Sequence, residues 1–165
     1  MTQQQSKSTP ITRFQNYLQI NTAHPNPNYT AALDYLTSFA STIPSLKTQT
    51  LYLTTPDKPL LLITLSGSNP SLPAVLFNSH LDSVPAEPSK WTHDPFAAHL
   101  TQEGKIYARG AQDDKCIGMQ YLEAINQLKK SNLDYVPLRT VHISYVPEEE
   151  VGGFDGMKKF VESDV

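Results

Sequence analysis

The pattern of apolar and polar positions along the chain predicts an α/β fold. Apolar residues three or four positions apart predict helices over residues 10–22 and 29–43, each bounded by a proline. Two strands over 47–54 and 60–66, joined by a Thr-Pro-Asp-Lys-Pro turn, predict a hairpin. A further helix is predicted over 116–130. Its expected buried face consists of apolar residues at helical spacing: Ile117, Tyr121, Ala124, Ile125 and Leu128.

The remaining strands lie in the second half of the chain. Four consecutive apolar residues, 74–77, predict a short strand buried on both faces, as in a parallel sheet. Residues 105–108 and 138–146 predict two further strands, and a last helix is expected from about residue 155 to 161. This order of elements predicts an α/β domain with helices packed on a mixed, largely parallel sheet.

Composition narrows the class of protein. The chain has 165 residues, enough for one domain, with 39% hydrophobic and 18% charged residues, as in soluble globular proteins. A net charge of −3 gives no basic field for nucleic acid, and no apolar run is long enough to span a membrane. Residues 1–9 are polar, are expected to be flexible, and lack the apolar stretch of a secretory signal. Because Cys116 is the only cysteine, we expect no internal disulfide and a cytoplasmic location.

Polar side chains directly follow the strand predicted at 74–77. His80 and Asp82 are two positions apart, so on extended backbone they point to the same side. A metal-binding histidine usually has its second ring nitrogen held by a carboxylate, which fixes the tautomer and the ring orientation. His80 is therefore a candidate metal ligand, and Asp82 is its candidate orienting carboxylate. The alternative is a capped turn, in which His80 satisfies a backbone group and Asp82 begins a loop. His24, in a proline-rich connector, is expected to be a solvated loop residue.

Two more acidic groups stand at comparable points of the chain. Asp113 and Asp114 precede the helix predicted over 116–130, where the helix dipole and unpaired amides favour a carboxylate. Capping explains one of the two aspartates more readily than both. Three adjacent glutamates, 148–150, follow the strand predicted over 138–146, and two glycines come soon after them. Such glutamates repel one another unless a positive charge compensates, although a solvated run of charges is the alternative.

These groups predict a metal site. In open α/β sheets, binding sites collect outside the carboxyl ends of the strands, and three successive ends carry these side chains. One imidazole with several carboxylates and no thiolate cluster suits zinc, with manganese or cobalt as second choices. An excess of carboxylates suits two metal ions, because a carboxylate can bridge a pair. A covalent mechanism is poorly supported, since no G-x-S-x-G motif is present and Cys116 has no placed histidine.

Four segments in order resemble the aminoacylase-1 family of N-acyl-L-amino-acid amidohydrolases, within the larger group of dinuclear-zinc deacylases and exopeptidases. They are His-Leu-Asp-Ser-Val-Pro at 80–85, Trp-Thr-His-Asp-Pro-Phe at 91–96, Tyr-Ala-Arg-Gly-Ala-Gln-Asp-Asp-Lys at 107–115 and Pro-Glu-Glu-Glu-Val-Gly-Gly at 147–153. The resemblance covers essentially residues 10–163. Two stretches, residues 91–96 and 108–112, point to the aminoacylase branch in particular.

The resemblance implies a role for each candidate residue. His80 would bind one zinc ion, with Asp82 orienting its ring. Asp113 would bridge two zinc ions, and the peptide bond after it is often cis in the family. Glu149 would be the general base, and Glu150 would bind the second zinc. The implied reaction is zinc-dependent hydrolysis of small N-acyl-L-amino acids to a free amino acid and a carboxylate.

Two departures from the family pattern keep other functions open. Asp114 stands where aminoacylases usually have methionine, whereas related peptidases carry aspartate there. A dinuclear-zinc dipeptidase or carboxypeptidase is therefore the alternative enzyme, and a metal-binding chain without turnover is a third possibility. The family also has another acidic ligand, a histidine ligand and a dimerisation domain beyond the position of Val165. We therefore expect residues 10–165 to be the N-terminal portion of the zinc-binding catalytic domain of a homodimeric enzyme.

Overall fold

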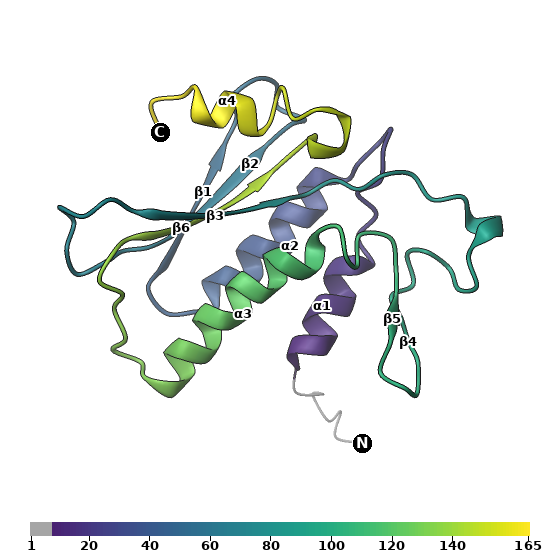
Figure 1. Cartoon of the computed structure of the whole chain (residues 1–165), viewed down its shortest axis with the longest axis horizontal. Helices are drawn as coiled ribbons and strands as arrows, with labels where there is room; N and C mark the ends of the chain where they lie inside the picture. Colours follow the sequence, from purple (N-terminus) through teal and green to yellow (C-terminus); the bar gives the residue numbers. More distant parts are fainter. Residues whose placement is uncertain (1–7) are drawn as a thin grey trace, which may run out of the picture.

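The computed structural model describes residues 8–165 (Figure 1). Residues 1–7, most of the predicted flexible N-terminus, lie outside the described residues. The helices are α1 (Pro10–Leu18), α2 (Tyr29–Ser41), α3 (Lys115–Ser131) and α4 (Met157–Val161), with single 3₁₀ turns at Pro88–Lys90 and Glu149–Val151. The strands are β1 (Leu46–Leu51), β2 (Leu60–Leu65), β3 (Val75–His80), β4 (His99–Leu100), β5 (Ile106–Tyr107) and β6 (Val141–Val146).

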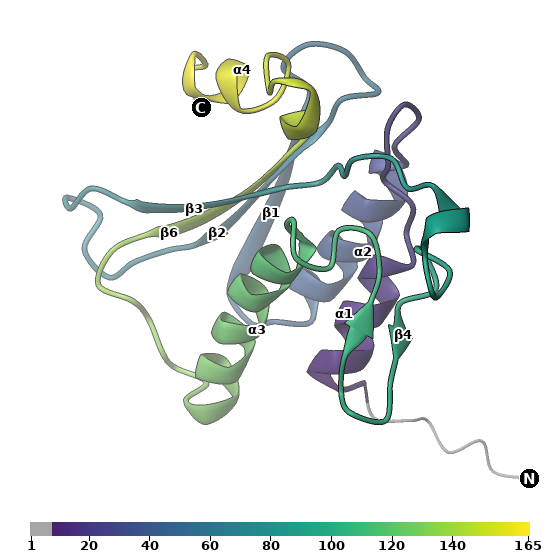
Figure 2. The same cartoon turned by 45° about the vertical axis from the view of Figure 1, so that its right-hand side comes forward.

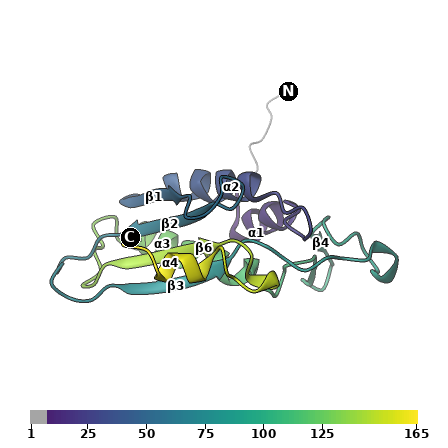
Figure 3. The ribbon, with the colours of Figure 1, turned by 90° about the horizontal axis from the view of Figure 1, so that it is seen from above.

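Four strands form a mixed sheet in the order β1-β2-β6-β3, which Figure 3 shows from above. The predicted hairpin is confirmed, because β1 and β2 pair antiparallel. Strand β6 pairs antiparallel with β2 and parallel with β3, from Val75 opposite Val141 to His80 opposite Val146. The predicted mixed α/β architecture is therefore confirmed, and among the described strands the parallel pairing is confined to β3 and β6. Strands β4 and β5 form a separate hairpin.

Helices α1, α2 and α3 lie on one side of the sheet and α4 lies on the other (Figure 2). Local sequence explains where the first two begin: the Thr9 and Asn28 side chains accept hydrogen bonds from backbone amides of α1 and α2, respectively. The main core fills the space between the three helices and the sheet, and includes Leu36, Ile63 and Ile143. Within residues 8–165, no helix is both long enough and apolar enough to cross a bilayer.

The buried face of α3 agrees with the predicted one only in part: Ile125 is buried and Tyr121 packs against the core. Ile117 and Leu128 are 37% and 44% exposed, and the helix turns other residues, among them Gly118 and Leu122, toward the core. The close approach at Gly118 decides this orientation, because a Cβ there would lie 2.6 Å from the Tyr145 ring. Helical spacing counts apolar side chains and does not show that the face centred on a glycine and Leu122 is the one that packs on the sheet.

The prediction that residues 74–77 are buried on both faces is wrong. Val75, Leu76 and Phe77 are 38–43% exposed. Strand β3 lies at the edge of the described sheet and pairs only with β6. A run of apolar residues does not reveal how many neighbours a strand has, so the burial of this segment could not be derived from its composition.

Candidate metal centre

The carboxyl end of β3 leads into an extended segment held by its neighbours. The Leu81 amide donates to the Val146 carbonyl at 2.8 Å, which continues the parallel pairing one residue beyond the strand. The next pairing partner is the segment 22–24, which forms a parallel bridge between Ala23 and Ser83. Flanked on both sides, Asp82 is completely buried.

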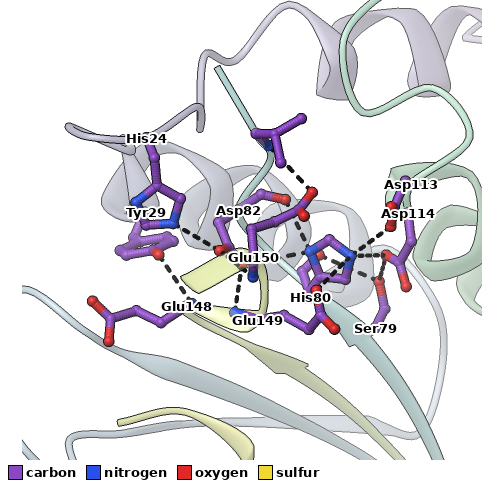
Figure 4. A network of polar contacts seen from close by, with 11 residues as sticks. His24, Tyr29, Ser79, His80, Asp82, Asp113, Asp114, Glu148, Glu149 and Glu150 are labelled. Atoms are coloured by element: carbon purple, nitrogen blue, oxygen red, sulfur yellow. Dashed lines mark hydrogen bonds and ion pairs between the residues drawn. The ribbon is translucent and has the colours of Figure 1, made fainter. Parts of the chain in front are cut away.

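The His80 ring is fixed by contacts at both of its nitrogens (Figure 4). Its Nδ1 lies 2.9 Å from the backbone carbonyl of Asp82 and 3.4 Å from that residue's carboxylate. The backbone carbonyl is the nearer acceptor for Nδ1, and Nε2 lies 2.9 Å from the Asp113 carboxylate. His80 and Asp82 thus interact as the spacing predicts, although the backbone oxygen is the nearer acceptor.

The Asp82 carboxylate connects the segment after β3 with the loop after β6 and with the connector that contains His24. Its two oxygens accept hydrogen bonds from the backbone amides of Glu149 and Glu150, at 3.1 and 3.0 Å. One oxygen also lies 2.8 Å from Nε2 of His24. Burial alone would raise the pKa of Asp82, but the hydrogen bonds from His80, His24 and the Glu150 amide hold it below its usual value. The buried side chain is therefore an anion that positions the glutamate segment.

The prediction that His24 is a solvated loop residue is wrong. Its side chain is 14% exposed and contacts Asp82, 58 positions further along the chain. The connector reaches Asp82 because its backbone pairs with Ser83, where the His24 amide donates to the Ser83 carbonyl at 3.0 Å. No local signal predicts this contact, since the two segments meet only in the folded chain.

Asp113 and Asp114 precede α3 and are joined by a cis peptide bond, as the resemblance implies. Asp114 accepts a hydrogen bond from the Ser79 hydroxyl at 2.6 Å and makes no side-chain cap on α3, so the capping alternative does not describe it. The Asp113 side chain is 74% exposed and contacts His80. Lys115 is buried and donates to the Ile20 carbonyl at 2.7 Å, which anchors this segment to the end of α1.

The three adjacent glutamates separate after β6. Glu148 has a positive φ of 64° and pairs with Lys58 at 2.9 Å, which directs its charge away from the others. Glu150 accepts a hydrogen bond from the Val84 amide at 3.2 Å. One Glu149 carboxylate oxygen lies 3.9 Å from Nε2 of His80, and its side chain is 55% exposed. The run is therefore not a uniformly solvated stretch of charge, because each member has its own contact.

His80, Asp113 and Glu150 form a potential metal-binding group. One ligand atom from each side chain lies within 4.8 Å of those of the other two. Burial and the nearby Asp113 charge raise the pKa of Glu150. Burial favours a neutral imidazole, but the contacts with Asp82, Asp113 and Asp114 outweigh it and raise the pKa of His80 to about 10. Crowded carboxylates around one imidazole fit a divalent cation, and nitrogen with oxygen donors fits zinc.

The fold and this group define a class: an α/β domain with a metal-type cluster of imidazole and carboxylates at the carboxyl end of its parallel strand pair. The chain belongs to Peptidase family M20/M25/M40, whose sequence profile matches residues 76–165. The family comprises metal-dependent hydrolases that act on amide bonds.

The resemblance to the aminoacylase-1 family is confirmed by curated relatives. Aminoacylase-1 of Mus musculus is 43% identical over 157 residues, and aminoacylase-1 of Dictyostelium discoideum is 40% identical over 154 residues. These alignments cover 95% and 92% of this chain but only 38% and 36% of the relatives. The chain thus spans less than two fifths of the length of the aminoacylases that it matches.

Solved structures have the same fold. Human carnosine dipeptidase 1 superposes with a TM-score of 0.72 over 93% of this chain and 34% of that one, at 21% identity. The M20 family metallo-carboxypeptidase Sso-CP2 from Sulfolobus solfataricus superposes with a TM-score of 0.71 over 87% and 32%, at 26% identity.

Proposed function

We propose that the protein carrying this chain hydrolyses N-acyl-L-amino acids to a free amino acid and a carboxylate. The observation that carries the proposal is the group formed by His80, Asp113 and Glu150, in a chain 43% identical to an aminoacylase. The same three residues are separated by 33 and 37 positions in the sequence (113 − 80 and 150 − 113), so their convergence is a property of the fold.

Zinc is the proposed metal, with two ions in a complete site. When bound, zinc supplies a Lewis acid that polarises the amide carbonyl and lowers the pKa of a water molecule. His80 would hold the metal through Nε2, and Asp113 and Glu150 through their carboxylates. Because the Asp113 side chain is largely exposed, its carboxylate would also be accessible to a second ion.

Glu149 is the proposed general base. It lies beside the group without belonging to it, with a carboxylate oxygen 3.9 Å from the His80 ring. Its exposure leaves the carboxylate accessible to water and substrate. In the proposed reaction, Glu149 accepts a proton from the attacking water and then donates it to the nitrogen of the leaving amine.

Asp82 is the proposed positioning residue for both groups. It orients the His80 ring and holds the backbone amides of Glu149 and Glu150. Outer hydrogen bonds of this kind fix the tautomer and the direction of a metal-binding imidazole. The same carboxylate therefore sets the distance between the metal ligands and the base.

The proposal also covers the substrate, the oligomeric state and the cellular location of the enzyme. The small-molecule substrate would be an N-acyl amino acid, and the whole protein would be a homodimer, as the aminoacylase resemblance implies. A cytoplasmic location fits a chain with one cysteine, since a lone thiol is most easily kept reduced there.

Dipeptide hydrolysis is the second candidate function. It is favoured by Asp114, which stands where related peptidases carry aspartate and which accepts the Ser79 hydrogen bond at 2.6 Å. The chain is also 36% identical, over 100 residues, to a probable carboxypeptidase S-like protein of Dictyostelium discoideum.

One assay separates the two functions. The longest product of the gene, loaded with zinc, is tested on N-acetyl-L-methionine and on alanyl-methionine, and released methionine is measured. The proposal predicts release from the N-acetyl compound, and loss of that activity after a chelator. Release from the dipeptide alone would support the second candidate, and no release from either would contradict both.

A further inference from the structure

The Asp82 carboxylate has a hydrogen-bond partner to which the proposed reaction gives no role. Nε2 of His24 lies 2.8 Å from one of its oxygens, and Figure 4 shows the imidazole directed at the carboxylate. An ionised carboxylate offers only acceptors, so the proton in this contact belongs to Nε2 and His24 is the donor.

We propose that His24 is a positioning residue of the metal centre, which holds the Asp82 carboxylate in the orientation that the His80 ring needs. This inference rests on the proposed function, because that function supplies the zinc ions and the role of Asp82. His24 lies outside the potential metal-binding group, so it acts through Asp82 and not as a ligand.

The contacts of the Asp82 carboxylate are divided between its two oxygens. Oδ1 lies 3.4 Å from Nδ1 of His80 and accepts from the Glu149 amide at 3.1 Å. Oδ2 accepts from the Glu150 amide at 3.0 Å and from His24 at 2.8 Å. Each oxygen thus has one backbone amide and one imidazole. Because both oxygens belong to one planar group, loss of the His24 bond at Oδ2 would also loosen Oδ1 beside His80.

The backbone places His24 independently of its side-chain contact. The His24 amide donates to the Ser83 carbonyl at 3.0 Å, and the Ser83 amide donates to the Thr22 carbonyl at 3.1 Å. These bonds use no side-chain atom of His24, so the connector should keep its place when that side chain is replaced. Substitution at position 24 therefore isolates the hydrogen bond to Asp82.

Water competes with His24 for the carboxylate. The His24 side chain is 14% exposed and lines a cavity of about 370 Å³ together with Tyr29, Lys58 and Glu148, whereas Asp82 is completely buried. A polar cavity of this size can hold water. A small side chain at position 24 would admit a water molecule that donates to Asp82. An apolar side chain of the size of histidine would exclude that water and leave the oxygen with one partner fewer.

Three variants separate a hydrogen-bond donor from a side chain that only fills space. His24→Gln brings an amide N–H near the position of Nε2 and should retain the zinc affinity of the wild-type chain. His24→Phe keeps a ring without a donor and should lower it by about three- to tenfold, less than the roughly 10- to 100-fold cost of losing a direct outer partner of a ligand. His24→Ala, which admits water, should lie between them. A space-filling role predicts the reverse order for Phe and Ala.

Zinc affinity of the 165-residue chain is measured by competition with a chromophoric chelator. The control His142→Phe makes the same change at a half-buried histidine of β6, which contacts the Thr64 hydroxyl at 2.9 Å, and should leave the affinity unchanged. Equal affinities in His24→Phe and the wild-type chain, or tighter binding by His24→Phe than by His24→Ala, would overturn the proposal. If His24→Phe does not fold, His24→Leu takes its place, because leucine has nearly the volume of histidine and no donor.

A double-mutant cycle tests whether His24 acts through Asp82. In an Asp82→Asn chain the neutral amide is a weaker acceptor, so adding His24→Phe should lower zinc affinity by less than about twofold. The same loss in this background as in the wild-type chain would show that His24 affects the zinc ions by another route, which contradicts the positioning role.

Nuclear magnetic resonance gives a readout that needs neither zinc nor turnover. A long-range proton–nitrogen correlation spectrum of the wild-type chain should show a proton on Nε2 of His24, and a proton on Nδ1 alone would overturn the proposal. The amide resonances of Glu149 and Glu150 should shift in His24→Phe and stay in place in His24→Gln. In both variants the amides at positions 24 and 83 should remain slow to exchange, since the connector stays paired.

Failure of the proposed function can be distinguished from failure of this inference. No turnover by the longest gene product would contradict the proposed function, whereas the tautomer of His24 and the shifts of the two glutamate amides do not depend on turnover. Conversely, an active enzyme in which His24→Phe changes neither zinc affinity nor these amides would retain the proposed function and exclude His24 from it.

Discussion

The two ends of strand β3 reverse the usual relation between polarity and burial. At its beginning, the apolar side chains of Val75, Leu76 and Phe77 are 38%, 43% and 40% exposed. At its end, Ser79 and His80 are 0% and 4% exposed. Both ends belong to one strand with one partner, β6, so the strand's own pairing does not explain the difference.

The surroundings explain it. The beginning of β3 has α3 on one side and an open sheet edge, whereas its end is enclosed by α3, the segment 22–24 and the loop after β6. The buried polar groups are stable there because each has a partner: Ser79 donates to Asp114, and His80 contacts Asp82 and Asp113. The candidate metal centre therefore lies at the end of the strand where paired polar groups are enclosed on several sides, and not at the apolar end.

The largest effect is expected at the buried polar end. Removing the imidazole in His80→Ala should lower zinc affinity by more than the roughly 10- to 100-fold that loss of an outer hydrogen-bond partner costs. Zinc binding to the 165-residue chain is measured by competition with a chromophoric chelator. The control is His99→Ala, an exposed histidine in the β4–β5 hairpin. If His80→Ala bound zinc as tightly as the unchanged chain, the polar end of β3 would have a structural role and would not bind a metal.

The next prediction separates binding from chemistry at the same end. Glu149→Gln should reduce turnover of N-acetyl-L-methionine by about 10²-fold or more, because the neutral amide cannot accept a proton. Zinc content should stay unchanged, since Glu149 lies outside the metal-binding group. Activity is measured on the longest gene product, with the exposed Glu103→Gln as control. Loss of zinc from Glu149→Gln would instead make this residue a ligand.

A smaller effect is expected from the residue that holds the polar end together. Asp82→Asn keeps the size of the side chain but removes the charge that accepts from two amides and His24. We expect zinc affinity to fall by about 10- to 100-fold, as for other orienting carboxylates. The matched control Asp134→Asn changes an exposed aspartate and should have no effect. Equal affinities in the two variants would remove Asp82 from the proposed mechanism.

The smallest effect is expected at the apolar end, measured as the free energy of unfolding in urea. Val75→Ala, at a 38% exposed position, should cost about 1 kcal/mol or less. Val146→Ala makes the same change opposite His80, where the side chain is completely buried, and should cost about 2 kcal/mol. Similar costs for the two variants would show that the beginning of β3 is covered in solution.

Much of the site was predictable because its residue types mark strand ends. His80 and Asp82, Asp113, and the glutamates 148–150 each follow an element that the hydrophobic pattern predicts, and the structure brings His80, Asp113 and Glu150 together. The residue types, one imidazole with several carboxylates, can be read from the sequence alone. These donor groups indicate a divalent cation even when their contacts are not known.

The burial of particular side chains was not predictable in the same way. The exposed beginning of β3, the orientation of α3 at Gly118 and the contact between His24 and Asp82 all depend on neighbours that are distant in the sequence. A periodic pattern gives one face of one element, and it contains no information about which other element covers that face.

Local sequence was enough to predict the main helices, the strands of the four-stranded sheet and the donor groups at their ends, because propensity, turn chemistry and side-chain type are properties of short segments. Which of these groups meet depends on how distant segments pack together. The register of β3 against β6, the bridge between Ala23 and Ser83, and the close approach at Gly118 bring the imidazole to the carboxylates. Each is a packing relation between segments far apart in the chain, and such relations exist only once the core has formed.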